Sequence, residues 1–417
     1  MRNCIIGQSG GPTAAINSTL AGIIKKCNEM NYDHIYGMIN GVQGFLEGQY
    51  IDLKEVIDSE DKLKLLKHSP AMYLGSCRYK LPALDSEDQS TYTDLFTRLK
   101  ALDVTDVFYI GGNDSMDTVA KMSKYAKSIQ SDMHVIGLPK TIDNDLMNTD
   151  HTPGFGSAAK YVASSMLEIV YDSAIYKLDA VTIVEIMGRN AGWLTAASAL
   201  ARTDQNMAPD LIYLPEVPFD KQKFLYDIGT VLNKKSSVVV AVSEGIKDKD
   251  GNYLDSDSDY ARKDVFGNIL HSGTGKVLEG LVSNYFGCKV RSIELNVLQR
   301  CAMHIASKVD LDESFDIGQY AVEQACQGVT NGMVVINRLS SFPYKSEFRV
   351  RNVSHIANLE HKVPVEWINE DHNDVTPALV EYLYPLIQGE VAMQYENGIP
   401  KYIDIKHLEH TFHDYDK

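Results

Sequence analysis

Two short segments carry side chains that together could move a phosphoryl group. Residues 111–115 (Gly-Gly-Asn-Asp-Ser) follow an apolar run and open a helical pattern, so their backbone N–H groups could meet a phosphate. Residues 139–145 (Pro-Lys-Thr-Ile-Asp-Asn-Asp) follow a second apolar run. They set two carboxylates two positions apart, close to a lysine. A phosphate cradle, a cation and paired carboxylates are the parts that phosphoryl transfer requires.

The spacing of Asp143 and Asp145 suggests a division of work. If the loop is extended, both carboxylates point to the same side. One would accept a proton from a substrate hydroxyl, and the other would support Mg²⁺ directly or through water. Alternatively the loop is an acidic surface turn, although Lys140 and Thr141 directly before it make that less attractive. The glycine turns also have a purely structural interpretation, as tight connections with helix caps.

Three further motifs stand directly after apolar runs. They are Gly10-Gly11-Pro12, Met187-Gly188-Arg189 and Ser243-Glu244-Gly245. A carboxylate such as Glu244 could accept hydrogen bonds from sugar hydroxyls. Arg291 and Arg300 flank a predicted strand and could bind a substrate phosphate.

The elements that must position these residues alternate along the chain. Helical apolar spacing is found over 16–24, and residues 194–201 are rich in Ala and Leu. The apolar runs predict strands at 4–6, 35–39, 104–110, 135–138, 181–186, 211–214 and 238–242. Continuous apolar strands alternating with helices indicate parallel sheets covered on both faces. Ligands bind at the carboxyl ends of such strands, which is where the motifs fall.

The composition limits the possible partners. Lys and Arg number 40 against 56 Asp and Glu, a net charge of −16, which argues against a nucleic-acid or anionic-membrane surface. An acidic chain with an anionic substrate must gather its basic residues locally or use a metal cation. The six scattered cysteines lack C-x-x-C spacing and fit reduced thiols in the cytoplasm, and the short apolar N-terminal run is no signal peptide or membrane span.

Taken together, the five motifs resemble those of the phosphofructokinase family, in the same order from Cys4 to about Arg300. Within the family the chain is similar to the pyrophosphate-dependent branch. ATP-using members generally carry glycine at the positions of Asp114 and Lys140. An aspartate would occupy the space of the ATP α-phosphate and repel it, while a lysine would balance charge on pyrophosphate in the transition state.

The resemblance implies a glycolytic kinase that transfers a phosphoryl group reversibly from Mg-pyrophosphate to the 1-hydroxyl of fructose 6-phosphate. Asp143 is the implied base, and the other implied catalytic residues are Thr141, Arg189, Lys140 and Asp114. The implied donor-binding residues are Gly11, Arg78, Gly112, Asp114, Ser115 and Lys140. The implied sugar-phosphate residues are Thr141, Ile142, Asp143, Met187, Gly188, Arg189, Glu244, Arg291 and Arg300. The implied Mg²⁺ residues are Asn113 and Asp145.

The resemblance also implies a fold of two Rossmann-like α/β/α domains with the site in the cleft between them. We expect a donor domain at 1–139, a sugar-phosphate domain at 140–298, and a return to the first domain plus a C-terminal extension at 299–417. After about Asn337 the pattern is less regular, apart from a possible helix at 377–387. A homo-oligomer, dimer or tetramer, is expected.

Three positions depart from the family pattern. Asn113 stands where an aspartate usually helps to hold Mg²⁺, and an asparagine supplies no charge. Residues 296–300 (Asn-Val-Leu-Gln-Arg) replace a Gly-Tyr-x-Gln-Arg pattern, so Arg300 is kept without the tyrosine. Many ATP-dependent members have, near the position of Ala180, a basic residue that reaches the substrate of a neighbouring subunit, and Ala180 cannot do that. The alternatives are ATP as donor, sedoheptulose 7-phosphate as acceptor, and an inactive regulatory subunit.

Overall fold

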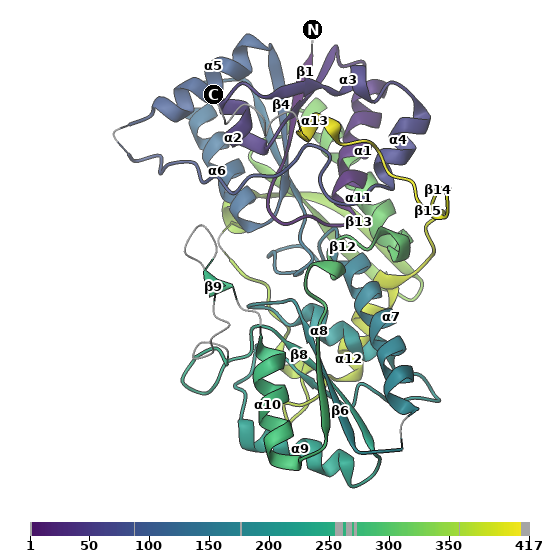
Figure 1. Ribbon diagram of the computed structural model, residues 1–417. Helices are drawn as coiled ribbons and strands as arrows, with labels where there is room; N and C mark the ends of the chain where they lie inside the picture. Colours follow the sequence, from purple (N-terminus) through teal and green to yellow (C-terminus); the bar gives the residue numbers. More distant parts are fainter. Residues whose placement is uncertain are drawn as a thin grey trace.

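The protein folds into two α/β lobes, one above the other in Figure 1. The computed structural model describes residues 2–86, 88–175, 177–254, 262–263, 269–270, 273–357 and 359–409. Each lobe is built on a mainly parallel sheet with helices on both faces. The predicted fold class is therefore confirmed, and it follows from the alternation of apolar runs with helical patterns.

The upper sheet has seven strands in the order β13-β12-β5-β4-β1-β2-β3. Its inner neighbours pair in parallel, and the two edge strands, β3 and β13, pair antiparallel. The strands are β1 (Asn3–Gln8), β2 (His34–Met38), β3 (Tyr50–Asp52), β4 (Val104–Gly111), β5 (His134–Pro139), β12 (Gly332–Ser341) and β13 (Tyr344–Asn352).

Alternate residues of these strands enter opposite cores, as a strand buried on both sides requires. Cys4 and Ile6 of β1 belong to one buried cluster, whereas Ile5 belongs to another. The first cluster includes residues of α1 (Ile16–Glu29), α3 (Leu53–Val56), α4 (Glu60–Lys67) and α11 (Lys308–Cys326). The second includes residues of α2 (Gly41–Leu46), α5 (Ser90–Ala101) and α6 (Asn113–Ser128).

The lower sheet is parallel throughout, in the order β11-β6-β8-β7. Its strands are β6 (Ala180–Ile186), β7 (Leu211–Tyr213), β8 (Ser237–Ser243) and β11 (Lys289–Glu294). One face packs on α7 (Phe155–Ala174), α8 (Trp193–Ala197) and α12 (Pro377–Leu383). The other packs on α9 (Lys221–Leu232) and α10 (Thr274–Phe286). All seven predicted strands are present in the two sheets, each within two residues of its predicted ends.

Short elements complete the chain. The strand pairs are β9 (Arg262–Lys263) with β10 (Ile269–Leu270), and β14 (Tyr395–Glu396) with β15 (Ile399–Pro400). The single turns are η1 (Ser198–Ala201), η2 (Asn296–Gln299), η3 (Met303–Ile305), η4 (Val353–His355), η5 (Val365–Trp367), η6 (Tyr384–Ile387) and α13 (Lys406–Glu409). Within the described residues, no helix combines the length and the apolarity needed to cross a bilayer.

The C-terminal part is more regular than the sequence suggested. The chain does not become irregular near Asn337, because β12 and β13 extend the upper sheet as a long antiparallel pair. The buried run 333–336 gives β12 apolar side chains on both faces. The helix predicted at 377–387 is found as α12 and η6 in the lower lobe. From there the chain returns to the upper lobe, where α13 lies (Figure 1).

Candidate active site

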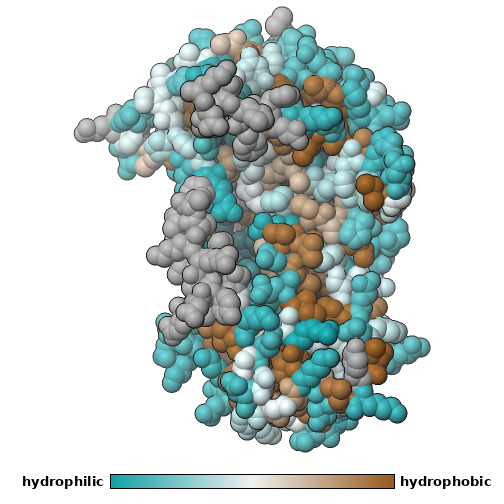
Figure 2. Space-filling view, in the orientation of Figure 1, coloured by the Kyte–Doolittle hydropathy of each residue, from teal (hydrophilic) through white to brown (hydrophobic). Residues whose placement is uncertain are grey.

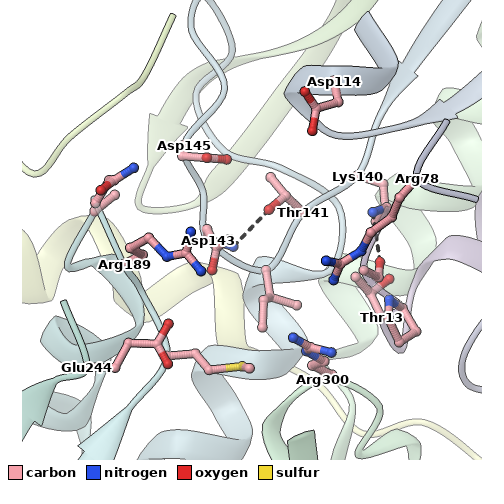
Figure 3. Close-up of a pocket in the computed structure, with 16 residues that line it drawn as sticks. Thr13, Arg78, Asp114, Lys140, Thr141, Asp143, Asp145, Arg189, Glu244 and Arg300 are labelled. Carbon is pink, nitrogen blue, oxygen red and sulfur yellow. Dashed lines mark hydrogen bonds between the residues drawn. The ribbon is translucent and has the colours of Figure 1, made fainter. Parts of the chain in front are cut away.

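A cavity of about 410 Å³ is lined by residues of both lobes. The segments that follow β1, β4, β5, β6 and β8 all contribute, so the site gathers at the carboxyl ends of parallel strands. The lining residues, shown in Figure 3, are Gly11, Pro12, Thr13, Arg78, Asp114, Lys140, Thr141, Ile142, Asp143, Asp145, Met187, Arg189, Asn190, Ala191, Glu244 and Arg300.

Lys140 is fixed against the first glycine turn. Its Nζ donates a hydrogen bond to the carbonyl of Gly11 at 2.8 Å, and only 2% of the residue is exposed. Gly10 has φ +86°, and a Cβ there would lie 3.0 Å from the Lys140 Nζ, so the turn needs glycine. Burial lowers the pKa of Lys140 to about 8, against the opposing charges of Asp143 and Asp145. A buried cation at a glycine turn is suited to an anionic ligand.

The second glycine turn leads into α6. A Cβ on Gly111 would lie 1.9 Å from the Ser115 Oγ, and Ser115 donates to the Ser9 Oγ at 3.1 Å. Gly112 and Ser115 therefore lie behind the cavity lining and shape the turn. Asp114, in the first turn of α6, is exposed and forms an ion pair with the Lys80 Nζ at 3.0 Å. Sequence reasoning missed Lys80, because only the fold brings it beside Asp114.

The loop that carries the two aspartates is bent rather than extended. Asn144 has φ +56°, a left-handed conformation that asparagine tolerates better than most residues. The backbone N–H of Asp143 donates to the Thr141 Oγ1 at 3.1 Å (Figure 3). The condition of an extended loop is therefore not met, yet Asp143 and Asp145 both line the cavity.

Asp143 lies among cations. Burial raises the pKa of Asp143, and the positive charges of Arg300, Lys140 and Arg189 oppose that rise. Figure 3 shows the Arg189 guanidinium directed toward Asp143 from the left, with Arg300 at the lower right. A buried carboxylate of raised basicity is suited to accept a proton from a ligand.

Two more carboxylates face the same space. Burial, followed by the charge of Asp143, raises the pKa of Asp145 to about 7 and that of Glu244 to about 8. Carboxylates gathered in this way would gain from a bound cation. Mg²⁺ usually takes one or two carboxylates together with substrate phosphates, so Asp145 fits such an ion.

The acceptor side is formed by the turns after β6 and β8. The Gly188 N–H donates to the Glu244 Oε1 at 3.3 Å, and the Ser243 Oγ donates to the Gly188 carbonyl at 2.6 Å. Gly188 has φ +136°, and a Cβ there would lie 2.5 Å from the Ala191 carbonyl oxygen. Gly188 thus fixes Glu244 from behind, while Met187 and its other neighbours line the cavity.

Besides the residues that support the turns from behind, two further predicted site residues lie outside the cavity lining. Arg291 pairs with Thr182 in the middle of β6, not at a strand end, and donates to the Asp172 Oδ2 at 3.2 Å. Its predicted contact with a sugar phosphate is therefore not formed by this chain's own cavity. The Asn113 Nδ2 donates to the carbonyl of Leu359 at 2.6 Å. In the described part of the chain, no group of three or more His, Cys, Asp or Glu residues could hold a metal by itself.

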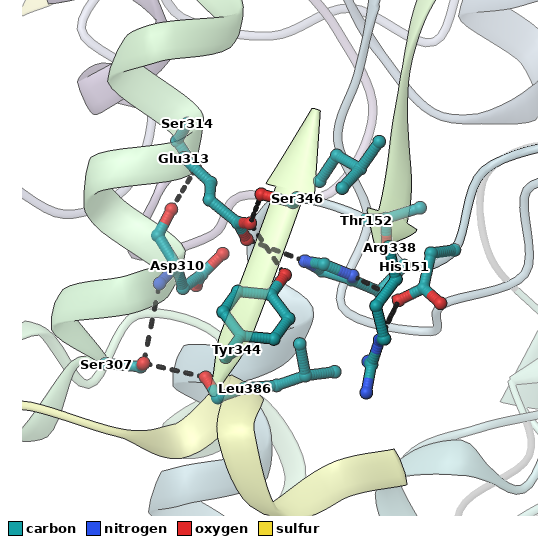
Figure 4. A network of polar contacts seen from close by, with 12 residues as sticks. His151, Thr152, Ser307, Asp310, Glu313, Ser314, Arg338, Tyr344, Ser346 and Leu386 are labelled. Carbon is teal, nitrogen blue, oxygen red and sulfur yellow. Dashed lines mark hydrogen bonds and ion pairs between the residues drawn. The ribbon is translucent and has the colours of Figure 1, made fainter. Parts of the chain in front are cut away.

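A buried polar network lies behind the aspartate loop (Figure 4). His151 forms ion pairs with Asp150 and Glu313, each at 2.8 Å, and Arg338 contacts Asp150 at 2.9 Å. The Tyr344 hydroxyl donates to Glu313 at 2.6 Å. These residues come from the segment before α7 and from α11, β12 and β13, so the network joins the loop region to the upper lobe.

Two α/β lobes that enclose a charged cavity beside glycine turns are an arrangement typical of enzymes that transfer phosphoryl groups. The family model described as phosphofructokinase matches residues 3–324. The chain is 39% identical over 409 residues to a pyrophosphate–fructose 6-phosphate 1-phosphotransferase of Xanthomonas campestris, covering 97% of this chain and 96% of the relative. A relative of that name from Halomonas elongata is 37% identical, with 96% and 95% covered.

A solved structure gives the same result. It is a pyrophosphate-dependent phosphofructokinase from Nitrosospira multiformis, with a TM-score of 0.87, 37% identity and 96% of both chains covered. The chain belongs to the phosphofructokinase family.

Proposed function

We propose that this chain is a diphosphate:fructose-6-phosphate 1-phosphotransferase. It transfers a phosphoryl group from pyrophosphate to the 1-hydroxyl of fructose 6-phosphate, giving fructose 1,6-bisphosphate and phosphate, in glycolysis. The observation that carries the proposal is one cavity with Lys140 and Asp114 on its donor side and Asp143 at its centre. Similarity to relatives of this activity along the whole chain supports it.

Asp143 is the proposed base. Its carboxylate accepts the proton of the sugar 1-hydroxyl as that oxygen attacks the terminal phosphorus of pyrophosphate. Thr141 holds the Asp143 backbone, and Arg189 is placed to stabilise charge that develops on the transferred group. Little covalent work is left for the protein, so positioning and charge stabilisation carry most of the rate.

The other lining residues divide between the two substrates. Gly11, Arg78 and Lys140 hold pyrophosphate, with Gly112 and Ser115 shaping the turn beside it. Thr141, Ile142, Met187, Arg189, Glu244 and Arg300 hold the sugar phosphate. Arg291 would join them only if a second copy of the chain carried it to this cavity.

Mg²⁺ is the proposed cofactor, and Asp145 is the residue that fits it. When bound, the ion would screen the negative charge of pyrophosphate. Asp145 faces the cavity on the side of Asp114, away from Glu244 (Figure 3). Asn113 is not proposed as a Mg²⁺ ligand, because its side-chain amide donates a hydrogen bond to the Leu359 carbonyl and the residue does not line the cavity.

Pyrophosphate is favoured over ATP by two charged groups. Lys140 is buried beside the glycine turn, where ATP-using members generally have glycine and therefore no charge. Asp114 lines the cavity, and the family resemblance implies that ATP would place its α-phosphate there. The experiment is a donor-by-acceptor matrix on the purified chain, with pyrophosphate or ATP against fructose 6-phosphate or sedoheptulose 7-phosphate. Turnover with ATP but not with pyrophosphate would overturn the assignment of pyrophosphate as donor. Absence of turnover with every pair would indicate an inactive subunit.

We also propose a homo-oligomer in the cytoplasm. Figure 2 shows apolar side chains gathered along the middle of one face, down to the lower lobe. The exposed apolar residues include Val297 and Leu298, which are 57% and 64% exposed and lie close to Arg300 in the chain. Apolar surface of this kind marks association sites. Light scattering of the purified protein would give the number of copies, dimer or tetramer.

A further inference from the structure

Residues 359–363 (Leu-Glu-His-Lys-Val), here called the strap, contact the loops on both sides of the cavity. The strap lies in the part of the chain that crosses from β13 in the upper lobe to α12 in the lower lobe (Figure 1). No motif draws attention to it in the sequence. Among the described residues, however, it forms several hydrogen bonds with segments that line or support the site.

The first contact is with the donor side. The Asn113 Nδ2 donates to the carbonyl of Leu359 at 2.6 Å, and Asn113 is the first residue of α6. The next residue, Asp114, lines the cavity. The strap therefore fixes the start of the helix that follows the second glycine turn.

The middle of the strap holds the aspartate loop. The His361 N–H donates to the carbonyl of Asp145 at 2.8 Å. The carbonyl of His361 in turn accepts a hydrogen bond from the Trp193 Nε1 at 2.9 Å, and the two rings lie 4.9 Å apart. Trp193 is fully buried, so this part of the strap is attached to the core of the lower lobe.

The remaining contacts are with the acceptor side. The Asn190 Nδ2 donates to the Glu360 Oε1 at 2.7 Å, and Asn190 lines the cavity. The Glu216 Oε1 accepts from the N–H groups of both Val363 and Gly192, at 3.0 and 2.8 Å. The turn after β6 is thus hydrogen-bonded to the strap through the Asn190 side chain and through the Glu216 carboxylate, which both segments share.

We propose that Asn113 and Glu360 are positioning residues that clamp the donor loop and the acceptor loop to the strap. The clamp keeps the terminal phosphorus of pyrophosphate and the attacking sugar oxygen in line. The inference rests on the proposed function, since it concerns the alignment of those two substrates. Misplacement of reacting groups by about 1 Å costs roughly a hundredfold in rate, so a bridge between the two loops has a direct kinetic consequence.

The clamp also gives Asn113 a reason to be an asparagine. Only the amide has an N–H to donate to the Leu359 carbonyl. An ionised aspartate would set a carboxylate oxygen against a carbonyl oxygen and repel it. The amide is therefore the side chain that this contact requires, whereas a metal-binding role would favour the carboxylate.

The first experiment separates these two roles with Asn113→Asp and Asn113→Ala. We expect both variants to lower kcat with pyrophosphate by roughly tenfold or more, with no fall in the Mg²⁺ concentration needed for half-maximal rate. A kcat within about twofold of wild type, or a lower Mg²⁺ requirement in Asn113→Asp, overturns the clamp. Wild-type protein without pyrophosphate turnover would instead contradict the proposed function, so the two failures are distinguishable.

The second experiment tests the acceptor side. Glu360→Gln keeps a carbonyl oxygen for Asn190, whereas Glu360→Ala removes it. We expect Glu360→Ala to raise the KM for fructose 6-phosphate roughly tenfold, with a much smaller change for pyrophosphate, and Glu360→Gln to restore it. Glu370→Ala, an exposed glutamate further along the same segment, is the control and should leave both constants unchanged.

Two readouts exclude a merely structural effect. The free energy of unfolding of Glu360→Ala should match wild type, because the side chain is exposed. The fold-loss of kcat/KM in the double variant Asn113→Ala/Glu360→Ala should be smaller than the product of the fold-losses in the two single variants, because both residues hold the same strap. Multiplicative losses, or equal kinetics of Glu360→Gln and Glu360→Ala, would overturn the inference.

Discussion

Asn144 donates a hydrogen bond from its side-chain amide to the hydroxyl of Tyr382 at 2.9 Å, across 238 residues of sequence. Asn144 stands between Asp143 and Asp145 in a left-handed conformation, and its Oδ1 accepts from the Thr152 N–H at 3.0 Å. The Tyr382 hydroxyl in turn donates to the carbonyl of Asp150 at 2.7 Å. The bend that presents the two aspartates therefore depends on α12, at the other end of the chain.

Tyr382→Phe should lower both the free energy of unfolding and kcat. The change leaves the Asn144 amide and the Asp150 carbonyl without their buried partner, which costs about 1–3 kcal/mol. We expect that loss in urea unfolding, together with a lower kcat, because the aspartate loop loses its fixed bend. Tyr384→Phe, at a tyrosine that is 50% exposed, is the matched control. Equal unfolding curves for the two variants would show that the hydroxyl does not hold the loop.

Much of the site could be predicted because its residues stand directly after apolar runs. Strand ends in a parallel sheet meet at one edge, so Gly11, Asp114 and Lys140 come together in the upper lobe, and Arg189 and Glu244 in the lower lobe. That the two edges face one cavity is a property of the fold. For the same reason both aspartates reach the cavity although their loop is bent. The predicted family, the predicted fold and the similarity to pyrophosphate-dependent members are confirmed, while the roles of single residues stay predictions.

The supports could not be predicted, because they join segments that are far apart in sequence. Leu359 and His361 form these contacts through backbone groups, which every residue type has, so the sequence gives no indication of them. Tyr382 is one of 23 tyrosines, and nothing near it in sequence indicates its partner. The position of Arg291 inside β11, three residues before the strand ends, could not be predicted either, because a sequence indicates a strand but not its exact ends.

Asp143→Asn should reduce kcat by roughly 10²–10⁴, the usual range for loss of a general base. The amide keeps the shape of the side chain, so the fold and the KM for pyrophosphate should change little. Steady-state kinetics with saturating Mg²⁺ make the measurement, with Asp132→Asn at an exposed aspartate as the control. A variant that retains more than about a tenth of wild-type kcat would remove Asp143 from that role.

Lys140→Met should damage pyrophosphate turnover while keeping most of the buried volume. Removal of one preorganised charge contact typically costs about 2.7–4 kcal/mol in the transition state, or a factor of roughly 10²–10³. Because Lys140 also donates to the Gly11 carbonyl, the KM for pyrophosphate should rise as well. Lys127→Met, at an exposed lysine in the last turn of α6, is the control. Unchanged pyrophosphate kinetics in Lys140→Met would refute the donor role of Lys140.

Asp114→Gly should admit ATP weakly and reduce pyrophosphate turnover. The change removes a negative charge at the place of the ATP α-phosphate and releases Lys80 to meet it. The exposed ion pair itself contributes little to stability, so any loss should stay within the cost of a helical glycine, about 1 kcal/mol. Rates with both donors, on wild type and variant, make the test. The assignment fails if ATP use stays undetectable while pyrophosphate use is untouched.

His151 should make stability fall as the pH rises from about 6 to 9. Burial alone would lower the pKa of His151, but Glu313 and Asp150 outweigh burial and raise the pKa from 6.5 to about 9. The imidazolium therefore stabilises the folded state fully below pH 6.5, and that contribution disappears as the pH passes the folded-state pKa. A rise of this size corresponds to roughly 3 kcal/mol, as an order of magnitude.

His151→Gln lacks this titrating group but still offers an N–H to one carboxylate, so it isolates the effect. The difference in unfolding free energy between wild type and His151→Gln should be large at pH 6 and should shrink by roughly 3 kcal/mol at pH 9.5. Tyr344 does not titrate within this window, because burial, followed by the charge of Glu313, raises the pKa of Tyr344 far above it. Urea unfolding at both pH values makes the measurement, and His355→Gln at an exposed position controls for the loss of a histidine as such. A difference that is the same at both pH values would show that His151 is neutral between its two carboxylates.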